Sequence, residues 1–213
     1  MVTPADDRAL SYLALGDSYT IGEGIAAPDA WPRQLARTLR EDGIALSDPR
    51  VIATTGWTCD ELSAAIDAAA PANDQDFVSL LVGVNDQYRG VALDVFRPCF
   101  ARLLERAIGF ARGRAGRVLV LSIPDWGVTP FALAQGRSPD RIAAELDAYN
   151  GAARALCKLH GIAFVDVTGV SRALGSAQAM LADDGLHPSA AMYGEWAELA
   201  LPVAKRLLAG VAA

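Results

Sequence analysis

The chain has 213 residues, and 52 % of them are hydrophobic, which is enough for one sizeable core. Its formal net charge is −6, so it lacks the excess of positive charge that nucleic acids and anionic membranes attract. No apolar run reaches the ~18 residues of a candidate membrane-spanning helix. We expect a single domain over residues 1–213, with no nucleic-acid partner and no integral membrane association. The composition leaves the oligomeric state open.

The first residues, MVTPADDRAL, have neither the basic segment nor the apolar segment of a secretory signal peptide. Cys59, Cys99 and Cys157 lie far apart and form no Cys-x-x-Cys pair, which favours free thiols in a reducing compartment. We therefore expect a cytoplasmic protein. With two histidines and no cysteine cluster, the sequence gives no reason to expect a metal or any other cofactor.

Short apolar runs along the chain predict five buried β-strands, at residues 12–15, 50–53, 77–82, 117–122 and 163–167. Helical patterns separate them. The first helix is predicted to have Asp29 as its N-cap and Pro32 in its first turn. Further helices are expected at 59–69, at 96–111, at 142–159 and from 188–189 onwards, the last one bent at Pro202. His160 ends one of these helices before a glycine, a place that favours a cation, so we expect it to be structural.

Strands and helices alternate throughout, which predicts crossover connections and a parallel sheet covered by helices on both faces. The continuous apolar strands agree, because strands buried on both faces read that way. The predicted fold is α/β: a single-domain, flavodoxin-like three-layer sandwich with a five-stranded parallel sheet in the order 2-1-3-4-5.

Functional groups of open parallel sheets lie beyond the carboxyl ends of the strands. The first strand is followed by Gly16-Asp17-Ser18-Tyr19, the second by a turn that contains Gly56, and the third by Gly83-Val84-Asn85-Asp86. The predicted strand order puts the first strand between the second and the third. Ser18, Gly56 and Asn85 are therefore expected to lie side by side.

Acyl transfer needs a nucleophile, a base, a group that orients the base, and donors for the developing oxyanion. Ser18, His187 and Asp184 supply the first three, because the long connection after the fifth strand can bring His187 back to Ser18. Gly56 and Asn85, with the backbone N–H of Ser18, supply the donors. Taken alone, Ser18 reads as a helix cap and Asn85 as a turn former. Their occurrence together favours catalysis.

The same segments resemble the sequence blocks of the SGNH hydrolases, also called GDSL-type esterases and lipases. The matching segments follow one another in family order and extend from residue 13 to about residue 190: Gly16-Asp17-Ser18-Tyr19, Gly56, Gly83-Val84-Asn85-Asp86 and Asp184-Gly185-Leu186-His187. The resemblance implies that Ser18 is the nucleophile and that His187 is the base, oriented by Asp184. It also implies an oxyanion hole made of the Ser18 and Gly56 backbone N–H groups and the Asn85 amide.

Two positions next to these blocks leave choices open. Asp183 rivals Asp184 as the orienting group, but the three-residue step from Asp184 to His187 matches the family. Tyr19 stands where the founding motif has leucine, which leaves the shape of the acyl pocket open. Other aromatic residues on loops at this end of the sheet are candidates either for the substrate pocket or for simple packing: Trp57, Tyr88, Trp126 and Phe131.

The sequence thus predicts a serine esterase that hydrolyses small-molecule carboxylic esters through an acyl-enzyme. Small or short acyl groups are expected, because the chain has no room for a large lid domain. One alternative is an acyltransferase or thioesterase that uses the same triad. Another is a non-catalytic module that holds a phosphate or a flavin on the glycine-rich segment after the first strand. Against it, residues 16–24 do not read G-x-G-x-x-G and contain no P-loop lysine.

Overall fold

The structure of the protein is a computed structural model that describes residues 8–209. A β-sheet forms its central layer. Its five strands are all parallel and have the order β2-β1-β3-β4-β5, which confirms the predicted topology. The strands are β1 Tyr12–Gly16, β2 Arg50–Ala53, β3 Phe77–Leu81, β4 Val118–Leu121 and β5 Ala163–Val165.

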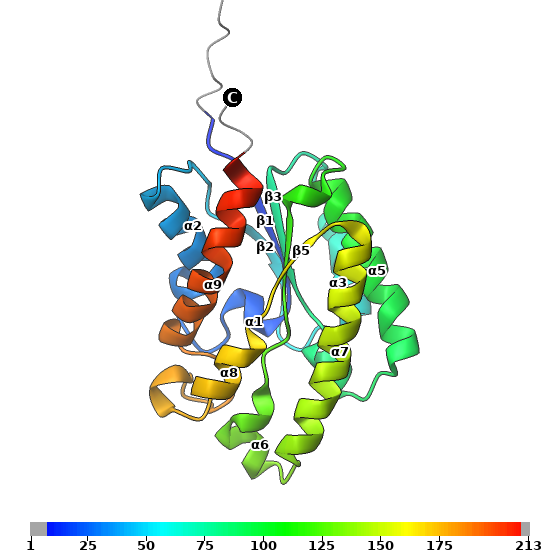
Figure 1. Cartoon of the computed structure of the whole chain (residues 1–213), viewed down its shortest axis with the longest axis vertical. Coiled ribbons are helices and arrows are strands. Elements are labelled where there is room, and N and C mark those ends of the chain that lie inside the picture. Colours follow the sequence, from blue (N-terminus) through cyan, green and yellow to red (C-terminus); the bar gives the residue numbers. More distant parts are fainter. Residues whose placement is uncertain (1–7, 210–213) are drawn as a thin grey trace, which may run out of the picture.

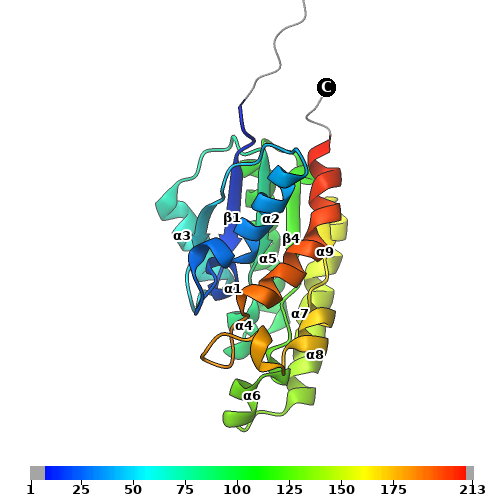
Figure 2. The ribbon, with the colours of Figure 1, turned by 90° about the vertical axis from the view of Figure 1, so that its left-hand side faces the viewer.

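Helices cover both faces of this sheet, so the molecule has the predicted three layers (Figure 1). Helices α2 and α9 pack against each other on one face, while α3, α5 and α7 lie on the other (Figures 1 and 2). The α-helices are α1 Ser18–Ile21, α2 Trp31–Glu41, α3 Cys59–Ala69, α4 Val84–Tyr88, α5 Leu93–Phe110, α6 Pro130–Ala134, α7 Pro139–His160, α8 Thr168–Leu174 and α9 Ala190–Leu208. Short 3-10 helices are η1 Ala27–Asp29, η2 Ala115–Arg117, η3 Trp126–Val128 and η4 Gln178–Met180.

The central strands are buried along their whole length, as their apolar sequences predict. Every residue of β1 and of β3 is buried. The polar member of β3, Ser79, is satisfied inside the core by a hydrogen bond of 2.9 Å with the Tyr12 hydroxyl. Burying a hydroxyl without a partner would be costly, so this pair makes the serine compatible with a central strand.

Two local expectations differ from the structure. Helix α2 begins at Trp31 with Ala30 as its N-cap, because Pro28 and Asp29 belong to the preceding turn η1. The connection after β5 is not one long loop, since it contains α8 and η4. Helix α9 contains Pro202, as expected, and extends to Leu208; the bend at Pro202 stays a prediction.

The strand register sets the position of the site. Gly16, the last residue of β1, is paired with Ala53 of β2 and with Leu81 of β3, so the chain leaves all three strands at the same level. A Cβ atom on Gly16 would lie 2.4 Å from the Leu81 carbonyl oxygen and 2.1 Å from Thr20 Oγ1. Glycine is therefore required here for the close approach of α1 to the sheet.

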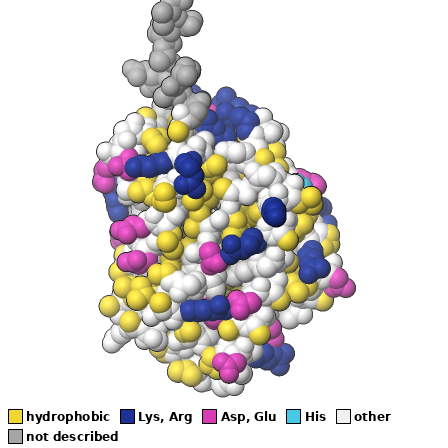
Figure 3. All heavy atoms as spheres, in the orientation of Figure 1, with side chains coloured by type: hydrophobic (Ala, Val, Ile, Leu, Met, Phe, Trp, Pro, Cys, Tyr) yellow, Lys and Arg dark blue, Asp and Glu magenta, His cyan; other side chains and the backbone are white. Residues whose placement is uncertain are grey.

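The face of the molecule seen in Figure 3 carries basic and acidic side chains interspersed with one another, without a basic stripe. Such a stripe is the electrostatic footprint expected of a nucleic-acid surface. In the described range, residues 8–209, no helix combines the length and the apolar character needed to cross a membrane.

Candidate active site

Ser18 is the first residue of α1, at the point where β1 ends. Its neighbour Asp17 is the N-cap of that helix, and Asp17 Oδ1 accepts a hydrogen bond of 3.0 Å from the Tyr19 N–H. The N–H groups of a first helical turn have no acceptor within the helix. In residues 8–209, nothing accepts a hydrogen bond from the Ser18 N–H, and the Ser18 hydroxyl makes none either. Both groups are therefore free to interact with a ligand in the adjoining cavity.

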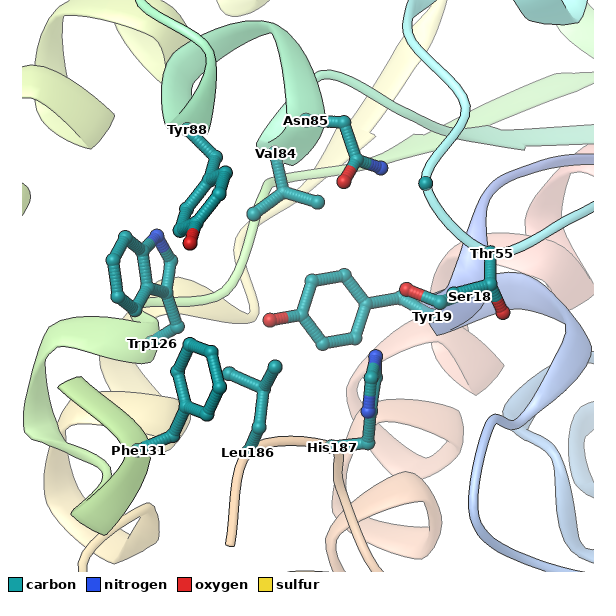
Figure 4. A pocket seen from close by; sticks show the side chains of 11 residues that line it. Ser18, Tyr19, Thr55, Val84, Asn85, Tyr88, Trp126, Phe131, Leu186 and His187 are labelled. Carbon is teal, nitrogen blue, oxygen red and sulfur yellow. The ribbon is translucent and has the colours of Figure 1, made fainter. Parts of the chain in front are cut away.

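His187 and Asp184 form a close pair in the turn that precedes α9. The Nδ1 atom of His187 lies 2.5 Å from Asp184 Oδ2. Asp184 Oδ1 accepts hydrogen bonds of 2.9 Å from the backbone N–H groups of Leu186 and His187, which fix the carboxylate in place. Figure 4 shows the His187 ring directed toward the Ser18 side chain. It is Asp184, rather than Asp183, that contacts the ring.

The electrostatics of this pair favour a carboxylate at Asp184. Burial opposes its ionisation, but the hydrogen bonds from the His187 ring and from the two backbone N–H groups outweigh it, so the pKa of Asp184 lies below its usual value. A carboxylate can only accept hydrogen bonds, so Nδ1 of His187 carries the proton. In the neutral ring, Nε2 is then a proton acceptor on the side that faces Ser18.

Gly56 and Asn85 bring further hydrogen-bond donors to the same place. Gly56 has a φ of +87°, and its N–H has no acceptor among residues 8–209. One N–H of the Asn85 amide donates to the Trp57 carbonyl at 3.0 Å. That bond fixes which end of the amide carries nitrogen, because a carbonyl only accepts. The second N–H of the amide remains available for a ligand.

These residues meet around a cavity of about 220 Å³. Figure 4 shows the side chains that surround it. The lining residues are Ser18, Tyr19, Thr55, Gly56, Val84, Asn85, Tyr88, Trp126, Phe131, Leu186 and His187. Of the five aromatic candidates from the sequence, Trp57 does not line the cavity and instead offers its carbonyl to Asn85. Sequence reasoning missed Thr55, Val84 and Leu186, which are small or aliphatic and carry no chemical signature.

An aromatic wall closes the end of the cavity away from Ser18. Its rings are those of Tyr88, Trp126 and Phe131, with centroids 5.5 Å apart for the first two and 6.3 Å apart for the last two. The Trp126 indole N–H donates to the buried Gln87 at 2.9 Å. The Arg137 guanidinium lies 4.9 Å from the centroids of both Tyr88 and Trp126. Nothing in the sequence singled out Gln87 or Arg137.

Two buried carboxyl groups lie behind the nucleophile. Burial, together with the nearby charge of Asp86, raises the pKa of Asp17 to about 8. Burial also raises the pKa of Asp86 to about 6. Asp86 Oδ2 accepts a hydrogen bond of 3.0 Å from the Cys59 N–H, whereas Asp17 Oδ2 is buried without a partner. Both residues thus hold backbone N–H groups next to the site, Asp17 that of Tyr19 and Asp86 that of Cys59.

The cysteines do not contribute to this site. Cys59, Cys99 and Cys157 are buried free thiols. Burial raises the pKa of the Cys157 thiol to about 12 and also raises that of Cys59, which keeps both in the unreactive thiol form. Within residues 8–209, no cluster of three or more His, Cys, Asp or Glu residues is placed to hold a metal ion.

Residues 14–194 match the profile of the GDSL-like Lipase/Acylhydrolase family. The match includes most of the chain and every residue of the site described above. The chain therefore belongs to this family, and it is a serine hydrolase of carboxylic esters.

Solved structures share the fold. TesA is 24% identical, with a TM-score of 0.70, over 93% of this chain and 99% of that chain. A lipase/acylhydrolase from Enterococcus faecalis is 22% identical, with a TM-score of 0.65, over 91% of this chain and 94% of the other. An acetylxylan esterase from Geobacillus stearothermophilus is 20% identical, with a TM-score of 0.66, over 93% of this chain and 94% of the other. None of the curated proteins matches the chain significantly.

Proposed function

We propose that the protein hydrolyses small or short-acyl carboxylic esters through an acyl-enzyme, with Ser18 as nucleophile, His187 as general base and Asp184 as the group that orients the base. One observation carries this proposal: the 2.5 Å Asp184–His187 pair stands at a cavity that Ser18 also lines. Family membership supplies the reaction class, and the geometry supports the role that we propose for each side chain.

In the first half of the reaction, Ser18 Oγ bonds to the acyl carbon while His187 Nε2 takes the hydroxyl proton. The tetrahedral intermediate collapses when the alcohol leaves with that proton, and the acyl group remains on Ser18. In the second half, water gives a proton to Nε2 and attacks the acyl carbon. Ser18 recovers its proton as the carboxylic acid departs. The Asp184 carboxylate keeps Nδ1 protonated throughout and stabilises the imidazolium that forms.

The negative charge that develops on the carbonyl oxygen needs donors fixed in advance. The Ser18 N–H, the Gly56 N–H and the second N–H of the Asn85 amide fill this role in the proposal. All three residues line the cavity, and both backbone groups lack an acceptor among residues 8–209. Donors that are already free and oriented need no rearrangement when the charge appears.

The dimensions of the cavity support a small acyl group. Its volume of about 220 Å³ is below the ~300–1,000 Å³ of typical ligand sites. The aromatic wall of Tyr88, Trp126 and Phe131 blocks extension away from Ser18. Acetyl, propionyl, butyryl and simple aryl esters are therefore the expected substrates, and the fastest hydrolysis is expected among them.

Replacement of Ser18 tests the proposal. Ser18→Ala is expected to abolish hydrolysis of p-nitrophenyl acetate while leaving the melting temperature near that of the parent, because triad members act as a unit. A fluorophosphonate probe should label Ser18 in the parent protein and leave the three cysteines unmodified. Retention of more than about a tenth of the rate in Ser18→Ala, or labelling of a cysteine, would exclude this mechanism.

The same triad also allows two alternatives: the acyl-enzyme transfers its acyl group to another alcohol, or a thioester acylates Ser18 with release of its thiol. Product analysis with and without added alcohol measures how the acyl group is divided between water and the alcohol. The proposal expects the free acid as the main product in both conditions, with p-nitrophenyl acetate as the acyl donor.

A further inference from the structure

Three residues of the α4 region hold the loop that contains Gly56: two lie within the helix and the third is its C-cap. Asn85 donates to the Trp57 carbonyl at 3.0 Å, and Asp86 accepts from the Cys59 N–H at 3.0 Å. Arg89, the C-cap residue of α4, donates to the Gly56 carbonyl at 2.6 Å. The turn after β2 is thus fastened to the helix that carries one of the proposed oxyanion donors.

The Arg89 guanidinium makes a second contact that fixes its own position. Its Nη1 atom lies 3.2 Å from both carboxylate oxygens of Glu61. Glu61 in turn accepts hydrogen bonds from the backbone N–H and the hydroxyl of Thr58, at 2.8 and 3.1 Å, in the capping box of α3. Arg89 therefore spans the loop from the Gly56 carbonyl to the beginning of α3.

The turn around Gly56 is closed by one backbone hydrogen bond, of 3.3 Å from the Trp57 N–H to the Thr54 carbonyl, and Arg89 adds a side-chain contact to it. Its φ of +87° lies in the left-handed region, where glycine has no steric preference for one arrangement. The atom nearest to a Cβ built on Gly56 would be Arg89 Nη2 at 3.7 Å. Among residues 8–209, the bond to Arg89 is the only hydrogen bond that the Gly56 backbone makes. Arg89 therefore restrains the Gly56–Trp57 peptide through its carbonyl, and through the Gly56 Cα it restrains the preceding peptide, which carries the Gly56 N–H.

We propose that Arg89 is a positioning residue for the oxyanion hole, which it serves by holding the Gly56 peptide in register with α4 and Asn85. This inference rests on the proposed function. Preorganised donors lose much of their effect when they are displaced by about 1 Å, which can cost ~100-fold in rate. Arg89 does not touch the substrate cavity and acts only through Gly56.

The exposure of Arg89 makes the inference testable. The side chains of Arg89 and Glu61 are 47% and 45% exposed, and exposed ion pairs contribute little to stability. Loss of Arg89 should therefore change catalysis more than folding. Arg102 offers a control, because it forms an even more exposed ion pair with Asp60 of the same helix α3, and its hydrogen bonds do not reach the loop.

The experiment compares Arg89→Ala, Arg89→Lys and Arg102→Ala by kcat, KM, melting temperature and affinity for a phenylboronic acid, which forms a tetrahedral adduct on the nucleophile. Arg89→Ala is expected to lower kcat roughly 10- to 100-fold and to weaken boronate binding in parallel, with KM within about twofold. Arg89→Lys should retain an intermediate kcat, because a single ammonium can contact the Gly56 carbonyl but cannot also grip both Glu61 oxygens. Arg102→Ala should match the parent.

Arg89→Ala with kcat and boronate affinity within twofold of the parent would overturn the inference. So would an equal loss of kcat in Arg102→Ala. If Arg89→Ala fails to fold, Arg89→Lys carries the same test, and a parental kcat in that variant overturns the inference. Failure of the proposed function looks different: Ser18→Ala would then stay active, whatever the Arg89 variants do.

Discussion

Asn85 presents one half of its amide to the protein and leaves the other half free. Its bond to the Trp57 carbonyl orients the side chain before any substrate binds. Asn85→Ala is expected to lower kcat by roughly 10²–10³ with little change in KM, because the donor matters most when the carbonyl oxygen carries charge. Steady-state kinetics and a melting curve on the same preparation check this. A lower melting temperature with a near-normal kcat would reduce Asn85 to a turn-forming residue.

Asp17 is the buried carboxyl group next to Ser18, with a pKa raised by burial from 3.8 to about 8. The folded protein thus keeps a proton that the unfolded chain loses above about pH 4, so this group makes folding less favourable as the pH rises from about 4 to about 8. The slope approaches ~1.4 kcal/mol per pH unit.

Asp17→Asn is therefore expected to gain stability relative to the parent across that range, since the amide keeps an oxygen to accept from the Tyr19 N–H and cannot ionise. Urea unfolding of both proteins at about pH 5 and about pH 8 measures the difference. The same difference at both pH values would mean that Asp17 is already ionised in the folded protein.

At the scale of single elements, α4, η3 and α6 each contribute one ring to the aromatic wall. Trp126 of η3 is held by Gln87 of α4, and Gln87 Nε2 donates to Glu145 of α7 at 2.7 Å. Gln87→Leu leaves the buried indole N–H without an acceptor, which should lower the free energy of unfolding by about 1–3 kcal/mol.

The same substitution frees the ring to move, so we expect the acyl-length preference to broaden: the ratio of kcat/KM for p-nitrophenyl hexanoate over acetate should rise several-fold. Leu133→Ala, on the exposed face of α6, is the control and should leave that ratio unchanged. An unaltered ratio in Gln87→Leu would show that the wall does not set acyl length.

The strands could be predicted because each is a short apolar run, and their order because strands and helices alternate as in flavodoxin-like folds. The bounds of α3, Cys59–Ala69, match the expectation. The meeting of Ser18, Gly56 and Asn85 follows from strand order alone. The direction of the Trp57 side chain does not, because it depends on the left-handed backbone at Gly56 that precedes it. Helix α8 was missed since its sequence, TGVSRAL, is short and has no clear apolar periodicity.

At the scale of the whole molecule, Asp76 ties the start of the sheet to the end of α5. It accepts hydrogen bonds from the Ser11 N–H and hydroxyl at 3.0 and 3.1 Å and forms an ion pair with Arg8 at 3.0 Å. Arg112 and Arg114 lie 3.4 and 3.7 Å away. Burial opposes ionisation, but these hydrogen bonds and charges outweigh it, so the pKa of Asp76 lies below its usual value.

A lowered carboxyl pKa stabilises the fold above the pKa of the unfolded chain, near 4, and this contribution is lost as the pH falls through the folded value. Asp76→Asn should therefore be less stable than the parent at neutral pH, by roughly 1.5–3 kcal/mol, and the gap should narrow in acid. Chemical unfolding at about pH 7 and about pH 3 measures both. If the difference in stability between the two proteins is the same at both pH values, the charge of Asp76 is not its cause.

Helix α9, the last helix of the fold, packs along α2, which is one of the first (Figure 2). His187 lies just before α9, whereas Ser18 begins α1, which precedes α2 in the chain. During synthesis the nucleophile therefore leaves the ribosome long before the base. Until α9 follows, the apolar face of α2, with Trp31, Leu35 and Leu39, stays uncovered by that helix. Esterase activity in a translation mixture should appear only after α9 has left the ribosome and packed on α2, so the activity reports the folding of the domain rather than the synthesis of its nucleophile.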